Sequence, residues 1–152
     1  MVDTIKISQF PSGGNQINGD ILTGLRTGAN TNFNTDAAGT FSPIPFSVVT
    51  SLFLAMAPNN GYAANNAGQV TLLLPVFFNV GDIIEVAAFG AGGFQITQNA
   101  AQQIIFGLSS TTIGIGGTIT STQVGDSLMM KGIVENSSWM IIGGVQGNLI
   151  VV

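Results

Sequence analysis

The stretch VGDIIEVAAFGAGGFQIT, residues 80–97, decides the fold of this chain. It opens with a Gly-Asp turn, continues as an apolar run over 83–89, turns at the glycine-rich segment 90–93 and resumes at Phe94. Short apolar runs that are bounded by glycine turns are typical of β-strands. The stretch therefore predicts a β-hairpin with a strand on each side of the glycine turn.

A second stretch of the same plan, VGDSLMMKGIVENSSWMII, covers residues 124–142. Its apolar strand over 127–134 is followed by a turn at 135–138 and by a return strand from Trp139. An aromatic residue opens the return strand in both units, so Phe94 and Trp139 are predicted core residues. Two matched hairpins predict an all-β fold, an antiparallel β-sandwich or barrel.

The chain divides into an extended N-terminal arm over 1–40 and a β-domain over 41–152. Turn-forming residues crowd the arm, and it holds five of the ten charged residues, whereas residues 37–81 hold none. The alternating Ile5-Lys6-Ile7 favours a short strand that is stable only when it lies on a partner. We expect the arm to contact other subunits through six residues: Ile5, Ile7, Phe10, Ile21, Leu22 and Arg26.

Charge is scarce throughout the chain. Only 7% of the residues are charged, where about 25% is usual for a soluble domain. The longest apolar stretch, over 44–57, is interrupted by proline, serine and threonine and is too short for a spanning helix, so no membrane partner is expected. The 22 Asn and Gln and 25 Ser and Thr residues outnumber the ten charges. Such side chains hydrogen-bond without the desolvation cost of a charge, which suits a surface that packs against copies of the same chain.

The residue inventory argues against catalysis. The absence of His and Cys excludes thiol nucleophiles, Ser-His-Asp triads and the usual zinc sites. Asp82 and Glu85 would point to opposite sides of a strand, which makes a poor acid–base pair. Asp82 and Asp126 are instead predicted to accept backbone N–H groups at turns. We expect no enzymatic activity, no cofactor and, with three basic residues, no nucleic acid partner.

Two ligand sites stay open at this stage. A calcium site could form from Asp20, Asp36 and neighbouring amide oxygens, although the spacing is not that of an EF-hand, so no metal is assigned. A carbohydrate-binding face could include Tyr62 with Asn and Gln side chains.

The second half of the chain resembles a β-module of bacteriophage virion proteins, over residues about 61–152. The shared motifs occur in a fixed order: Gly61-Tyr62, Asn65, Leu74-Pro75, Val80-Gly81-Asp82, Gly92-Gly93-Phe94, Ile96, Gln98-Asn99-Ala100, Gln102, Gly116-Gly117, Asp126, Trp139 and Gly147-Asn148. Two positions depart from the module, because Phe94 stands where Trp is common and Met130 falls in a strand that often carries Cys. The opening at 5–11 is similar to the starts of phage structural and tail-fibre proteins.

This resemblance implies a structural role in the virion and a trimeric assembly. The expected function is that of a capsid decoration (cement) protein, which is made in the host cytoplasm and binds the major capsid protein or another virion protein through its arm. A tail-fibre or spike module that binds a receptor is the alternative, and a secreted carbohydrate-binding module comes third.

Overall fold

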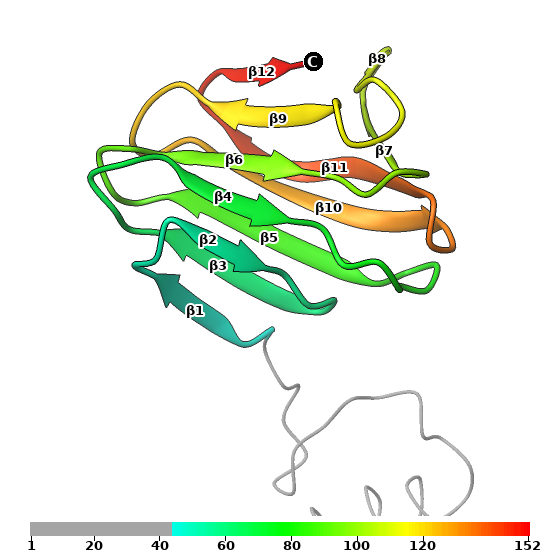
Figure 1. Cartoon of the computed structure of the whole chain (residues 1–152), viewed down its shortest axis with the longest axis horizontal. Helices are drawn as coiled ribbons and strands as arrows, with labels where there is room; N and C mark the ends of the chain where they lie inside the picture. The colour runs from blue at the N-terminus through cyan, green and yellow to red at the C-terminus, as the bar shows by residue number, and fades with distance from the viewer. Residues whose placement is uncertain (1–43) are drawn as a thin grey trace, which may run out of the picture. The chain divides into compact units, whose positions relative to one another are not determined.

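The computed structural model describes residues 44–152, and this part of the chain is built from β-strands without a helix (Figure 1). Accordingly, none of the described residues belongs to a helix long and apolar enough to cross a membrane. The prediction of an all-β fold is confirmed. The predicted arm over 1–40, with its contact residues between Ile5 and Arg26, lies outside the described residues.

Within residues 44–152, twelve strands form two sheets. The seven-stranded sheet has the order β1 (Phe46–Val49), β3 (Asn60–Ala64), β5 (Ile83–Ala88), β10 (Ser127–Val134), β11 (Ser138–Gln146), β7 (Gln103–Phe106) and β8 (Ser109–Ser110). The five-stranded sheet has the order β12 (Leu149–Val151), β9 (Thr118–Ser121), β6 (Phe94–Thr97), β4 (Val70–Leu73) and β2 (Phe53–Ala55).

The hydrophobic core lies between these two sheets, which Figure 1 shows as two layers. Alternate residues of the strands in both sheets contribute to it, because successive side chains of a strand point to opposite sides. Phe94 of β6 and Trp139 of β11 are both fully buried there. Trp139 packs on Phe78, with the ring centroids 4.1 Å apart.

The first six strands alternate between the sheets. β1, β3 and β5 pair in parallel in one sheet, and β2, β4 and β6 pair in parallel in the other. Each successive pair of strands, β1–β2, β3–β4 and β5–β6, is therefore one turn of a coil. We call this arrangement the three-rung stack.

The prediction of a hairpin over 80–97, and with it the antiparallel sheet, is wrong. β5 and β6 lie in different sheets, and five of the ten strand pairings in the described part of the chain are parallel. The glycine turn makes a corner that stacks on the corner below it, where Gly90 N–H donates to Ala64 O and Gly92 N–H donates to Asn66 O. A side chain at either glycine would collide with the backbone of residues 65–69. The glycines thus serve close stacking of corners, not a tight hairpin turn.

The prediction of a hairpin over 124–142 is confirmed by the antiparallel pair of β10 and β11. The two VGD motifs do not mark two equivalent hairpins. Each motif precedes one strand of the antiparallel pair β5 and β10. Gly81 N–H donates to Gly132 O at one end of this pair, and Gly125 N–H donates to Ala88 O at the other. The repeat in the sequence therefore reflects two antiparallel strands that start at opposite ends.

A buried amide fixes the long connection between β6 and β9. The Gln98 Nε2 lies 2.6 Å from Gln102 O, 2.6 Å from Thr112 O and 2.8 Å from Gly114 O. The Gln98 Oε1 accepts from the hydroxyl of Thr111 at 2.8 Å. Gln98, Gln102 and Thr111 are all buried, so this network ties backbone segments that no regular sheet pairing holds.

Candidate interaction surface

The described residues offer no cluster of side chains for metal binding. Residues 44–152 contain no group of three or more His, Cys, Asp or Glu side chains that could hold a metal ion. Asp82 accepts Asn79 N–H and the side-chain amide of Asn59, each at 2.8 Å, which confirms its predicted role at a turn. The alternative calcium residues Asp20 and Asp36 lie outside the described part of the chain.

The alternative of a carbohydrate-binding face that includes Tyr62 is wrong, because this side chain is buried and only 6% exposed. Its hydroxyl is bound to the backbone of Ala57, from which it accepts an N–H at 2.7 Å and to which it donates at 3.2 Å. Trp139 is fully buried as well, so it has no free ring face for a sugar.

Asp126 is a buried carboxylate with a structural role. Its Oδ2 accepts Thr122 N–H at 2.6 Å, Gln123 N–H at 3.1 Å and the Thr122 hydroxyl at 3.1 Å, as the turn prediction required. Burial acts to raise the pKa of Asp126, but the hydrogen bonds from Thr122 and Gln123 outweigh it and hold this pKa below its usual value.

We expect Asp126→Asn to lower the free energy of unfolding at pH 7 by about 2 kcal/mol, because it removes a hydrogen-bonded charge. A lowered pKa in the folded state stabilises the protein above the unfolded pKa of about 3.9 and loses this effect as the pH falls through the folded value. The difference between wild type and variant should therefore narrow below about pH 4. Urea unfolding at several pH values measures it. Glu135→Gln, at an exposed carboxylate in the turn between β10 and β11, is the control and should change the free energy of unfolding by less than about 0.5 kcal/mol. A difference that is constant from pH 7 to pH 3 would contradict the role of the charge.

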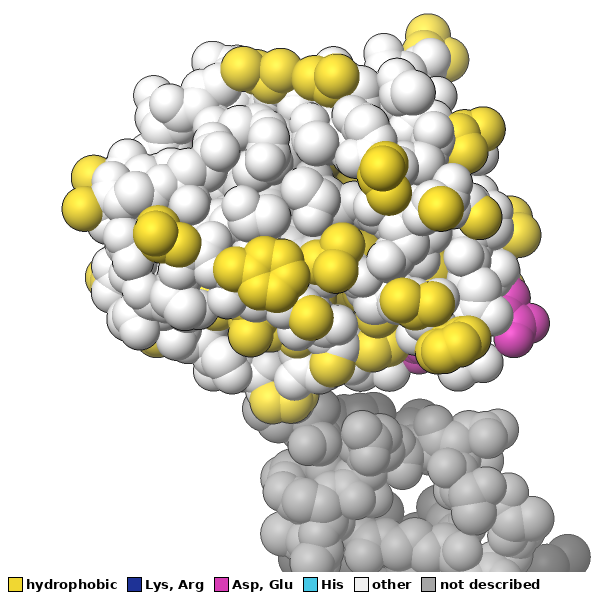
Figure 2. All heavy atoms as spheres, viewed as in Figure 1, with side chains coloured by type: hydrophobic (Ala, Val, Ile, Leu, Met, Phe, Trp, Pro, Cys, Tyr) yellow, Lys and Arg dark blue, Asp and Glu magenta, His cyan; other side chains and the backbone are white. Residues whose placement is uncertain are grey.

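The outward side of the five-stranded sheet is mainly polar. Hydroxyl and amide side chains point outward from its three central strands: Thr71, Gln95, Thr97, Thr118 and Thr120. White atoms predominate on the side of the molecule that shows these strands, and no basic side chain is visible there (Figure 2). Apolar side chains interrupt this polar side: a yellow patch lies in the lower middle of Figure 2, and Phe53 and Ile150 on the two edge strands of the sheet are exposed.

The outward side of the seven-stranded sheet has a different character, and we call it the outer face. The strand register arranges its residues in three rows. The rows are Val48–Ala63–Ala87–Ser127–Gln146, Phe46–Gly61–Glu85–Met129–Gly143 and Ile83–Lys131–Met140–Ile105. Most of these positions are aliphatic, aromatic or glycine, although their neighbours along each strand already fill the core. The sheet is therefore apolar on both sides.

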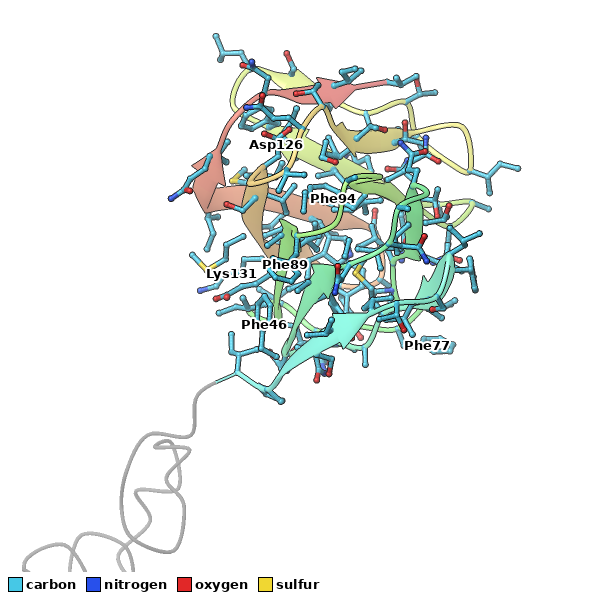
Figure 3. The ribbon with its side chains drawn as sticks, turned by 90° about the vertical axis from the view of Figure 1, so that its left-hand side faces the viewer. Phe46, Phe77, Phe89, Phe94, Asp126 and Lys131 are labelled. Carbon is cyan, nitrogen blue, oxygen red and sulfur yellow. The ribbon has the colours of Figure 1, made fainter. Side chains whose placement is uncertain are left out.

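A shallow groove crosses the outer face. It is lined by Phe46, Glu85, Ala87, Ser127, Met129, Gly144 and Gln146, together with the backbone side of β5 and β10. The ring of Phe46 covers Gly61, where a side chain would collide with it. Phe46 is 52% exposed, and it lies on the same side of the domain as Lys131, whereas Phe77 lies on the opposite side (Figure 3).

Two charged residues interrupt the outer face. Lys131 is the only basic residue among residues 44–152, and it lies between Ile83 and Met140 in its row. Glu85 lies between Gly61 and Met129. Each charge thus has uncharged neighbours on both adjacent strands.

The outer face was not identified among the predicted site residues, although the sequence carries a signal for it. Adjacent apolar pairs such as Ile83-Ile84 and Met129-Met130 place apolar side chains on both sides of a strand.

In comparisons with known proteins, no family model matches the chain, and no curated protein matches it.

Proposed function

We propose that the protein is a structural subunit of a bacteriophage virion, namely a capsid decoration (cement) protein that assembles as a homotrimer. The apolar outer face supports the self-association in this proposal, since large exposed apolar patches on a folded domain mark surfaces that bind other proteins. The ordered motifs over 61–152 support the assignment to a virion. In this proposal the two packed sheets are a β-sandwich, and the arm over 1–40 binds the major capsid protein or another virion protein.

Self-association through the outer face is tested by two matched substitutions. Phe46 and Phe53 are 52% and 57% exposed and lie on the edge strands of the two different sheets. We expect Phe46→Ser to weaken self-association about tenfold or more, because exposed aromatic side chains contribute strongly to interfaces. Phe53→Ser should leave it unchanged. Sedimentation equilibrium of the full-length chain over a range of concentrations measures both, and a wild-type protein that stays monomeric contradicts the proposal.

The virion assignment has its own test. Purified particles of the phage that encodes this chain should contain the protein in many copies, as measured by quantitative mass spectrometry of the particles. Particles without the protein would show that the assignment is wrong, even if the chain self-associates.

A tail-fibre module that binds a receptor is the second candidate, and one observation favours it. Three apolar side chains in the loops around β8 are strongly exposed, namely Leu108, Ile113 and Ile115. Exposed loops on a rigid scaffold are common binding sites. Binding of the isolated protein to host cells, abolished by Leu108→Ser and not by Phe53→Ser, would favour this function over decoration.

A further inference from the structure

Burial of the outer face against another molecule would remove Glu85 and Lys131 from water. A charge that is buried without a partner destabilises an interface, so a covering molecule that supplies opposite charges at these places is favoured. Neither residue finds one beside it, because Gly61 and Met129 flank Glu85 and Ile83 and Met140 flank Lys131. Within the sheet the two charges are diagonal neighbours on β5 and β10, at about 7–8 Å.

A second copy of the chain supplies what the outer face needs. The same surface presents one acidic and one basic residue, so two copies of it are complementary in charge as well as apolar. A self-complementary patch on both partners is the usual basis of symmetric homo-oligomers. A partner of one charge sign would leave either Glu85 or Lys131 unpaired.

The size of the outer face makes this complementarity important. Neighbouring strands of a sheet lie about 4.8 Å apart, and successive residues of a strand lie about 3.3 Å apart. Five strands of six residues therefore cover roughly 24 by 20 Å. Two such faces together bury about 1,000 Å², which is the lower end for a specific interface. At this size the contact depends on how well its few charges are paired as well as on its apolar area.

We propose that Lys131 of one copy pairs with Glu85 of the next copy when two outer faces pack against each other. This inference rests on the self-association in the proposed function and names the second copy as the partner. A self-complementary face joins two copies about a twofold axis, so in the proposed homotrimer this contact would link two trimers and would not close one. The pair selects the register in which two apolar sheets meet, and it disfavours other registers by leaving charges unpaired.

Charge reversal in the full-length chain tests the pairing. Glu85→Lys gives an outer face with two basic residues, and Lys131→Glu gives one with two acidic residues. Each variant alone should self-associate at least about tenfold more weakly than wild type, because like charges meet in the interface. An equimolar mixture of the two variants should restore association, as hetero-oligomers. A charge pair within one chain would not be restored by mixing, so the mixture shows that the pair joins two copies.

Glu135→Lys is the matched control. Glu135 is exposed at the turn between β10 and β11, and its reversal changes the net charge from -4 to -2, as Glu85→Lys does. Sedimentation equilibrium should give a wild-type association constant for this variant. Reversed outer-face residues that leave association unchanged, or a mixture that fails to restore it, would overturn the inference and leave self-association itself intact. A wild-type chain that is monomeric would overturn both.

A measurement on the unaltered chain covers the case in which a reversed variant does not fold. An equimolar mixture of ¹⁵N-labelled and unlabelled protein is treated with a carbodiimide, which joins an amine to a carboxylate that it contacts. We expect a cross-linked peptide in which Lys131 and Glu85 carry different isotope labels. Cross-links between these residues that carry only one label throughout would overturn the inference.

Discussion

Phe94→Ala is expected to lower the free energy of unfolding by about 4 kcal/mol, the largest effect of any substitution proposed for this protein. Phe94 is the first residue of β6, is fully buried, and lies between the two sheets (Figure 3). Its removal loses the transfer free energy of the ring and leaves a cavity that two hydrogen-bonded sheets cannot close. Urea unfolding at one fixed protein concentration measures the loss, since association would otherwise contribute to it.

Phe77→Ala is the matched control, because Phe77 is 78% exposed and lies in the connection between β4 and β5. We expect it to change the free energy of unfolding by less than about 0.5 kcal/mol. Equal losses for the two variants would show that Phe94 is not part of a closed core.

Gln98→Ala is expected to lower the free energy of unfolding by about 3 kcal/mol. The substitution removes the donor to the carbonyl groups of Gln102, Thr112 and Gly114. It leaves the hydroxyl of Thr111 with only the distant carbonyl of Ile104, at 3.5 Å, as an acceptor. These groups are in the interior of the connection from β6 to β9, where water cannot replace the lost partner without opening the loop.

Gln95→Ala provides the comparison with the same residue type on the same strand. Gln95 points outward from β6 and makes only a long contact of 3.5 Å with the hydroxyl of Thr120. Its loss should alter the free energy of unfolding by less than about 0.5 kcal/mol in the same urea experiment. A Gln98→Ala variant that is as stable as Gln95→Ala would contradict the structural role of the buried amide.

The sequence predicted strands correctly where glycine turns bound apolar runs, and it failed at the level of which strands pair. The segments 83–88 and 94–97 are strands, but a glycine corner such as 90–93 has the same composition whether it closes a hairpin or connects two sheets. The difference depends on Gly90 and Gly92 stacking on the corner at 65–69, a contact distant in sequence. Local propensity carries no information about such a contact.

The outer face, too, could be predicted from the sequence only in part. Alternation along a strand could have indicated that both sides of β5 and β10 are apolar, because paired residues such as Ile83-Ile84 are visible in the sequence. That Glu85 and Lys131 share this surface follows only from the register of β5 against β10. The arm residues from Ile5 to Arg26 remain predictions.

The free energy of local opening differs between the three turns of the three-rung stack. Among residues 44–152, β1 pairs with β3 alone. Pro45 O and Val49 O accept the N–H groups of Gly61 and Asn65, while the amides of Phe46 and Val48 point away from β3. β5, by contrast, is held between β3 and β10. In a stacked array each unit is stabilised by its neighbours, so the free energy of opening rises from the first rung to the third. Any tension transmitted along the chain into residue 44 thus reaches the least protected rung first, and the domain can yield there without unfolding as a whole.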